Sequence, residues 1–240
     1  MLKVRYRDEG EMSTGEVQGD EVVDRDEVRH VDEVDVLPPS DPTKVVCVGK
    51  NYVDHASELD SEVPDSPLLF MKPPSSVVGA FDPVRYPEDT DDLHYEGEVA
   101  LVVGRECRNV EESEALSYVE GYTCLNDVTA RDWQGRENQW FRAKGTDTFC
   151  PIGPYLQTDL SKIDGLEVTT RVNGEEVQHG DTGDMVFPPR ELVAEISRFV
   201  TLREGDVIAT GTPEGVGSVE RQDVVSVEVE GAGTLINEVV

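Results

Sequence analysis

Short apolar runs separated by glycine, proline and asparagine occur along most of this 240-residue chain. Runs such as 44–48 and 122–126 have the length of a β-strand rather than of a helix. Asn173-Gly174 stands between two further runs, and this dipeptide is the strongest short signal for a hairpin turn. Two segments, 110–119 and 189–202, have a convincing helical pattern. We therefore expect a β-rich α+β fold rather than a doubly wound α/β sheet.

The first 43 residues differ in composition from the rest of the chain. Asp and Glu are dense there, the apolar residues are mostly single valines, and Pro38-Pro39-Ser40-Asp41-Pro42 closes the segment. A proline-rich stretch of this kind is typical of a linker. The sequence therefore predicts a short acidic N-terminal appendage at residues 1–43, followed by one main domain at residues 44–240.

The chain is strongly acidic, and its charge excludes several classes of partner. It contains 51 Asp and Glu against 21 Lys and Arg, which gives a formal net charge of -30. Phosphate backbones and anionic lipid surfaces repel such a protein, so we expect neither a nucleic-acid nor a membrane partner. No stretch reaches the ~18 apolar residues of a membrane span, and the N-terminus lacks the apolar core of a signal peptide. The expected location is the cytoplasm.

The acidic residues are spread over the whole length instead of forming one tail, and 15 Arg accompany only 6 Lys. Concentrated salt screens the repulsion between surface charges of one sign, so an acidic, lysine-poor surface suits a salt-rich cytoplasm. The composition is that expected of a halophilic archaeal protein. An acidic protein from an ordinary cytoplasm is the alternative.

Three carboxylates are candidate ligands for a metal ion. Glu96 and Glu98 are two residues apart in an expected strand over 93–103, so their side chains share a face. Asp127 ends the expected strand at 122–126 and supplies a third carboxylate. All-oxygen ligation favours Mg²⁺, Mn²⁺ or Ca²⁺ over softer metals. From the spacing alone, a solvated strand edge in an acid-rich chain remains the simpler interpretation.

Two other segments contain residues suited to catalysis. His55 and Glu58 are three residues apart and share a face if their segment is helical, and a carboxylate can orient an imidazole as a general base. A surface ion pair explains the same spacing equally well. Lys144 lies in a polar turn, where a solvated lysine is the simpler interpretation. In the glycine-rich loop that follows residue 210, the amide of Gly211 and the hydroxyl of Thr212 are suited to binding a carboxylate.

Six sequence blocks, taken together and in this order, resemble the fumarylacetoacetate hydrolase family over about residues 45–240. The blocks are Gly49-Lys50-Asn51-Tyr52-Val53-Asp54-His55, Leu69-Phe70-Met71-Lys72-Pro73, Tyr95-Glu96-Gly97-Glu98-Val99-Ala100, Asn126-Asp127-Val128-Thr129-Ala130-Arg131-Asp132, Lys144-Gly145-Thr146-Asp147-Thr148-Phe149-Cys150-Pro151-Ile152-Gly153-Pro154 and Gly211-Thr212-Pro213-Glu214-Gly215-Val216-Gly217. One block would be a weak signal, whereas six in the family's order are specific. Lys50 and Thr146 depart from the family pattern, in which many relatives carry Arg and Phe.

The resemblance implies a mixed β-roll, usually a homodimer, with a divalent metal such as Mg²⁺, or else Mn²⁺ or Ca²⁺. It assigns a role to each matching position. The implied metal ligands are Glu96, Glu98 and Asp127, the catalytic residues His55, Glu58 and Lys144, the substrate-binding residues Gln134, Thr212 and Gly211, and the residue near the metal Thr148.

The resemblance also implies a small 2-oxo acid as substrate and an enolate whose charge a divalent cation stabilises. The reaction we expect is hydrolytic C–C cleavage of an acylpyruvate such as fumarylpyruvate or acetylpyruvate. The alternatives are decarboxylation of oxaloacetate and isomerisation of 2-hydroxyhepta-2,4-diene-1,7-dioate, which need the same cation but no attacking water. A non-catalytic dicarboxylate-binding protein and an acidic Ca²⁺-binding module are the alternatives outside enzymes.

Overall fold

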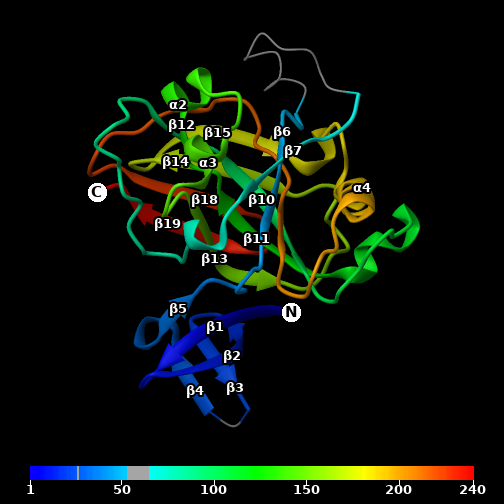
Figure 1. The fold of residues 1–240 in the computed structure, drawn as a ribbon. Coiled ribbons are helices and arrows are strands. Elements are labelled where there is room, and N and C mark those ends of the chain that lie inside the picture. Colours follow the sequence, from blue (N-terminus) through cyan, green and yellow to red (C-terminus); the bar gives the residue numbers. More distant parts are fainter. Residues whose placement is uncertain (26, 53–64) are drawn as a thin grey trace.

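A computed structural model describes residues 1–25, 27–52 and 65–240 (Figure 1). Its largest sheet has twelve strands and is mixed, because β6 and β8 run parallel to their neighbours β16 and β13 whereas the other pairs are antiparallel. The order along this sheet is β4 (Glu27–His30), β3 (Glu21–Asp24), β2 (Glu11–Gln18), β1 (Leu2–Asp8), β13 (Cys150–Gln157), β11 (Val119–Asn126), β10 (Gly97–Val103), β16 (Val207–Ala209), β6 (Val45–Gly49) and β7 (Leu68–Lys72), with β5 (Asp35–Leu37) beside β1 and β8 (Val77–Val78) beside β13.

Two smaller sheets and a few short helices complete the described part of the chain. One sheet contains β12 (Thr129–Ala130), β9 (Leu93–Tyr95) and β17 (Gly217–Ser218), and the other β15 (Glu175–Asp181), β14 (Glu167–Val172), β18 (Val224–Val229) and β19 (Gly233–Glu238). The helices are α2 (Arg131–Arg136), α3 (Phe141–Gly145) and α4 (Pro189–Phe199), with 3-10 turns η1 (Val31–Glu33), η2 (Pro74–Ser76), η3 (Glu112–Tyr118) and η4 (Thr182–Asp184). The prediction of a β-rich mixed β-roll is confirmed. In the part of the chain described here, no helix combines the length and apolarity needed to cross a membrane.

The predicted hairpin at Asn173-Gly174 is present between β14 and β15, which pair antiparallel. Asn173 and Gly174 both adopt positive φ, 52° and 84°. A two-residue hairpin of this type requires positive φ at both central positions, which Asn and Gly tolerate better than other residues. This local chemistry explains why the turn is readable from the sequence.

The two faces of β10 pack against different cores. Val99, Leu101 and Val103 belong to the larger apolar cluster, to which β14, β18, β19 and α4 also contribute buried side chains. Ala100 and Val102 face a second cluster built from β6, β11, β13 and β16. All of these side chains are buried, and each fully buried aliphatic side chain contributes about 1.5–3 kcal/mol to folding. Because β10 is covered on both faces, it is a rigid element from which functional side chains can project.

The two predicted helices have different outcomes. The apolar residues of 189–202 do form an amphipathic helix, but α4 ends at Phe199. Segment 110–119 is wrong as an α-helix, since its residues form the 3-10 turn η3. Asn109 has φ 52°, in the left-handed region, whereas the residue that caps a helix N-terminus has an extended backbone. The residue at the N-terminus of η3 is Glu111, which has an extended backbone.

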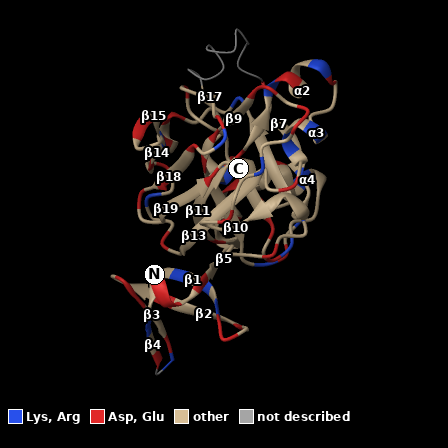
Figure 2. Ribbon diagram, turned by 90° about the vertical axis from the view of Figure 1, so that its left-hand side faces the viewer, with Lys and Arg blue, Asp and Glu red and all other residues tan. Residues whose placement is uncertain are grey.

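The acidic N-terminal residues form strands β1 to β5, drawn in dark blue in Figure 1, around a small cluster of Val4, Tyr6 and Val22. Strand β1 joins the large sheet by pairing with β13. Thr43 and Lys44, just before β6, donate backbone hydrogen bonds to the buried carboxylate of Asp206. The Lys44 ammonium also forms an ion pair with this carboxylate. Figure 2 shows Asp and Glu along both the N-terminal strands and the rest of the fold.

Candidate active site and metal centre

The predicted strand over 93–103 is broken at Glu96, which separates β9 in the three-stranded sheet from β10 in the large sheet. At the break, the amide of Glu96 donates to Oδ1 of Asn126 over 3.0 Å, and the carbonyl of Glu96 accepts from the amide of Asp127 over 2.8 Å. The amide of Gly97 donates to Oε1 of the buried Gln178 over 3.0 Å. The crossing between two sheets thus anchors Glu96 directly against the strand end that carries Asp127.

Gly97, between the two glutamates, has no room beside it for a side chain. A Cβ atom at this position would overlap with Oγ1 of Thr170 and would lie 3.3 Å from Cγ1 of Val227. Both neighbours belong to the four-stranded sheet, which packs closely against the start of β10. The glycine therefore allows the segment bearing Glu96 and Glu98 to approach that sheet.

Replacing Gly97 by alanine is expected to destabilise the fold by about 1–3 kcal/mol, the usual cost of inserting an extra methyl group into a packed core. Gly135→Ala is the matched control, because a Cβ there meets nothing within 4 Å and alanine favours the helix α2. Urea denaturation of both variants measures the effect. Equal stability of the two variants would show that the space beside Gly97 is not restrictive.

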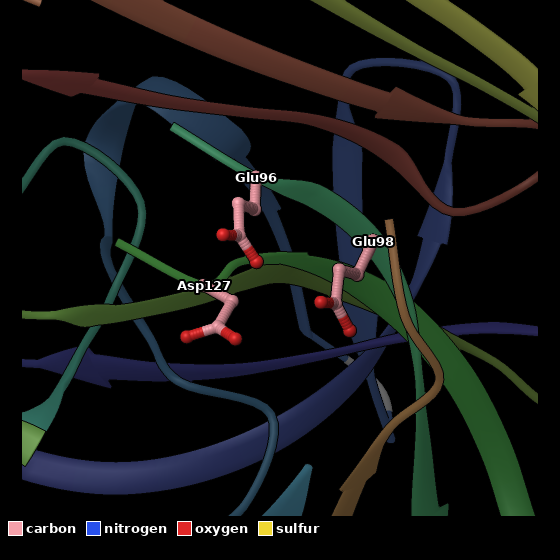
Figure 3. A group of neighbouring side chains, drawn as sticks. All are labelled: Glu96, Glu98 and Asp127. Carbon is pink, nitrogen blue, oxygen red and sulfur yellow. The ribbon is translucent and has the colours of Figure 1, made fainter. Parts of the chain in front are cut away.

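The three predicted carboxylates converge in the fold. One ligand oxygen from each of Glu96, Glu98 and Asp127 lies within 4.8 Å of the others, and Figure 3 shows the three side chains as close neighbours. The residues are 5%, 2% and 0% exposed. The alternative of a solvated strand edge is therefore wrong, since these acids lie in the interior.

Three cationic side chains surround the carboxylates, of which Lys72 and Lys144 are buried and Arg131 is partly buried. Nζ of Lys144 donates to Oε2 of Glu96 and to Oδ2 of Asp127, each over 2.8 Å. Nη2 of Arg131 lies 2.5 Å from Oε1 of Glu96, and Nζ of Lys72 lies 2.6 Å from Oδ1 of Asp127. The alternative of a solvated Lys144 is also wrong, because this residue is 2% exposed.

Glu98 differs from the other two acids in its partner. Its Oε2 accepts a hydrogen bond of 2.8 Å from the backbone amide of Gly211, a neutral donor. Burial raises the pKa of Glu98 well above its usual value, and the charges of Asp127 and Glu96 raise it further. A cation placed between the three carboxylates would offset this penalty and favour the ionised form.

The residues present fit a divalent cation. Three carboxylates offer only oxygen ligands, as Mg²⁺, Mn²⁺ and Ca²⁺ prefer. In addition, Oδ1 of Asp127 is buried and accepts no hydrogen bond from any described residue, although Lys72 is close to it. Buried carboxylate oxygens normally have hydrogen-bond partners, so an oxygen without one is suited to ligating a metal.

Lys144 is held in its protonated form. Burial lowers the pKa of its ammonium, but the neighbouring charges of Asp127 and Glu96 outweigh burial and raise the pKa above its usual value. Two of its three protons are directed at these carboxylates, and its Nζ also lies 5.1 Å from the centre of the Phe70 ring. The lysine is therefore a fixed positive charge and a proton donor at the carboxylate site.

A pocket of about 160 Å³ opens onto this group. Its polar wall contains Glu96, Glu98 and Lys144, and its apolar wall contains Phe70 and Trp140. The two aromatic rings pack edge to face with their centres 5.5 Å apart. The remaining lining residues are Val48, Gly49, Lys50, Arg131, Gln134 and Thr212. A small molecule in this pocket would contact the carboxylate site at one end and an aromatic surface at the side.

The predicted substrate-binding residues lie at or beside this pocket, but several of their groups already have partners. Oε1 of Gln134 accepts from Arg131 over 2.8 Å. The Thr212 hydroxyl donates to the carbonyl of Gly97 and accepts from Gln178, each over 2.9 Å. The Gly211 amide does bind a carboxylate, but it is the protein's own Glu98.

Three predicted site residues are not among those that line the pocket. Thr148 is described by the structure but does not line it, and His55 and Glu58 lie outside the described residues. The hydroxyl of Thr148 accepts from the backbone amide of Arg85 over 2.9 Å. Residues 53–64, which include His55 and Glu58, lie outside the described residues, so the roles of these two residues stay predictions.

Arg131 and Lys72 are the site residues whose roles the sequence analysis missed. The acid next to Arg131 in the sequence, Asp132, accepts from Thr90 and Arg136. The one sequence signal for Lys72 was a lysine at the end of an apolar strand in an expected core. Neither residue's pairing with Glu96 or Asp127 can be read from local spacing, because the partners are far apart in sequence.

Comparison with known proteins supports the same interpretation. A family model described as fumarylacetoacetate (FAA) hydrolase C-terminal matches residues 44–240. A human relative, oxaloacetate tautomerase FAHD2A, mitochondrial, is 46% identical over 216 residues, which cover 85% of this chain and 69% of the relative.

Two solved structures have a similar fold. The 5-carboxymethyl-2-hydroxymuconate delta-isomerase from Mycobacterium smegmatis has a TM-score of 0.92 and 41% identity, covering 100% of this chain and 98% of that protein. The fumarylpyruvate hydrolase from Pseudomonas aeruginosa, solved in complex with Mn²⁺ and pyruvate, has a TM-score of 0.80 and 33% identity, covering 85% of this chain and 91% of that protein.

Proposed function

Because the chain belongs to the fumarylacetoacetate hydrolase family, whose members are enzymes, we propose that it forms and protonates the enol of a 2-oxo acid with the help of a divalent cation. The observation that carries the proposal is the buried group of Glu96, Glu98 and Asp127 at the end of a small pocket that Lys144 also lines. When bound there, the cation would withdraw electron density from the 2-oxo oxygen of a chelating substrate.

The charges of the site support an anionic substrate. Three carboxylates face three cationic side chains, those of Lys72, Arg131 and Lys144, so the described group is formally neutral. A divalent cation would give it an excess of two positive charges in a buried position, where unbalanced charge is costly. A 2-oxo dicarboxylate carries two negative charges at neutral pH and would balance that excess. Lys50 at the pocket wall adds a further positive group.

Lys144 has a defined task in this proposal. Its ammonium is fixed by Glu96 and Asp127, so it needs no reorganisation when negative charge develops on a substrate oxygen nearby. It stabilises that charge and can transfer a proton to the oxygen, while the carboxylates hold its position. The base that removes the C3 proton is proposed to be His55, oriented by Glu58.

Keto–enol isomerisation is the reaction that we favour. It requires the charge stabilisation that Lys144 and a cation supply, and it needs no attacking water. The relatives named as a tautomerase and as an isomerase, at 46% and 41% identity, support this choice. Hydrolytic cleavage of an acylpyruvate is the second candidate, supported by the fumarylpyruvate hydrolase at 33% identity and by the His55 and Glu58 pair.

A metal-reconstitution assay tests the proposal. Protein stripped with EDTA is expected to be inactive, and Mg²⁺ or Mn²⁺ should restore turnover of oxaloacetate enol, acetylpyruvate or fumarylpyruvate, since the acidic site requires a cation. Product identification by NMR separates isomerisation from cleavage. The control is the same cation without protein, because divalent ions accelerate enolisation by themselves.

The outcome of this assay also decides between classes of protein. Binding of a 2-oxo dicarboxylate without any turnover would support a non-catalytic binding protein instead. Activity that is insensitive to complete removal of divalent cations would contradict the proposed role of Glu96, Glu98 and Asp127.

A further inference from the structure

Lys72 is a buried lysine at the end of the outer strand β7, and the mechanism above gives it no step. Its side chain is 0% exposed. Burying an ammonium is costly unless charge and hydrogen bonds compensate for the lost water. The contacts of Nζ therefore indicate what the residue does.

The three protons of the Lys72 ammonium all have backbone acceptors. Nζ donates to the carbonyl oxygens of Val128, Lys144 and Phe149 over 3.1, 2.5 and 2.7 Å. These carbonyls belong to the turn after Asp127, to the end of α3 and to the start of β13. One side chain thus joins three segments that converge on the carboxylate site.

The same ammonium lies 2.6 Å from Oδ1 of Asp127 but donates no hydrogen bond to it. A lysine ammonium has three protons, and the three carbonyls accept them all. Oδ1 is therefore paired with a positive charge, and a carboxylate oxygen has a further lone pair that a cation can use. Oδ2 of the same carboxylate accepts from Lys144 over 2.8 Å. The two lysines hold Asp127 from both sides and leave one oxygen available to a cation.

We propose that Lys72 is a positioning residue of the metal centre. Its contacts with the carbonyl of Lys144 and with the Asp127 carboxylate fix these two residues relative to each other and would hold the carboxylate in place for a cation. This inference rests on the proposed function, because it presumes that the three carboxylates bind a divalent cation.

The test is Mn²⁺ affinity, measured on metal-free protein by the electron paramagnetic resonance signal of free Mn²⁺. Lys72→Met preserves the side chain as far as Cε but removes the three donors and the charge. We expect its Kd for Mn²⁺ to rise about 10- to 100-fold, the range found when residues that orient metal ligands are replaced. The spectrum of bound Mn²⁺ should also change, because the Asp127 carboxylate is no longer held in place.

Lys44→Met is the matched control. Lys44 forms another ion pair with a buried aspartate, Asp206, but this pair joins the residue before β6 to the residue before β16. Its loss should lower the melting temperature without changing Mn²⁺ affinity or the bound spectrum. A purely structural role for Lys72 would make the two variants behave alike.

A second variant covers the case in which Lys72→Met does not fold. Lys72→Gln removes the charge but keeps two N–H donors on a side chain that is one atom shorter. We expect it to fold with a smaller loss of melting temperature and still to bind Mn²⁺ more weakly than the wild type. An unchanged or lower Kd in the folded Lys72 variants would overturn the inference. Absence of Mn²⁺ binding by the wild type would instead overturn the proposed function.

Discussion

Replacing Glu98 by glutamine is expected to abolish cation-dependent turnover and to weaken Mn²⁺ binding by at least about 100-fold, since loss of a residue that merely orients a ligand already costs up to that much. The side chain keeps its shape, and its carbonyl oxygen can still accept from the Gly211 amide. It loses, however, the charge that a cation requires. Isothermal titration with Mn²⁺ and a kcat measurement check the two effects.

The stability of this variant provides an independent check. Glu98→Gln removes one negative charge from three carboxylates whose ligand atoms lie within 4.8 Å of one another. Metal-free Glu98→Gln should therefore melt at the same temperature as the metal-free wild type or higher, because burial, together with the charges of Asp127 and Glu96, raises the pKa of Glu98 and disfavours its ionised form. Glu228→Gln, an exposed acid on β18 paired with Arg171, is the control and should bind Mn²⁺ normally. Full turnover by Glu98→Gln would exclude the proposed centre.

Replacing Lys144 by methionine should lower kcat by about 10²- to 10⁴-fold, the range that general acid–base groups contribute. Mn²⁺ binding should persist, because the three carboxylates remain and Lys72 still holds Asp127 in place. The expected signature is therefore a large fall in kcat at saturating Mn²⁺ with little change in metal affinity. Steady-state kinetics and Mn²⁺ titration on the same preparation measure both.

The matched control for this variant is Lys162→Met. Lys162 is exposed and pairs with Glu230 over 2.6 Å on the surface. Such surface pairs contribute about 0–1 kcal/mol, so neither kcat nor stability should change appreciably. A Lys144→Met protein that keeps its kcat would remove this lysine from the reaction and leave it a structural counter-ion.

The parts of the fold that depend on local patterns were predictable from the sequence. Alternation along β10 places Glu98 on the same face as Ala100 and Val102, and the structure confirms that Ala100 and Val102 share one buried face. The hairpin at Asn173-Gly174 was readable because its backbone angles restrict the residue types. In both cases a few adjacent residues determine the conformation.

Other features of the fold depend on contacts between distant segments, so local sequence patterns could not predict them. The break of the strand at Glu96 exists because β9 pairs with β12 and β17 while β10 joins the large sheet. At the start of the helix expected at 110–119, the amides of Asn109 and Val110 donate to the distant Ser197 of α4, and residues 112–118 form a 3-10 helix. Local helix signals are weak compared with such tertiary constraints.

The candidate site shows the same division. Glu96, Glu98 and Asp127 were named from strand spacing and family resemblance, and they do converge. Lys72 and Arg131, which balance their charges, were not. A lysine 55 residues before Asp127 gives no local sign that its ammonium will lie 2.6 Å from that carboxylate. Only the packing of β7 against α3 and the turn after Asp127 brings them together.

The most direct test of the account is hydrogen exchange at C3 of pyruvate in D₂O, followed by NMR with and without Mg²⁺. Exchange at this carbon reports enol formation itself, whichever reaction the enzyme completes. The account predicts exchange well above the rate with Mg²⁺ alone, and it predicts that EDTA or Glu98→Gln reduces the rate to that background. The contradicting result would be obtained with protein that has Mg²⁺ bound. It would be pyruvate exchange no faster than with Mg²⁺ alone, together with no conversion of oxaloacetate or acetylpyruvate. This result would exclude the proposal that the protein forms enols of 2-oxo acids.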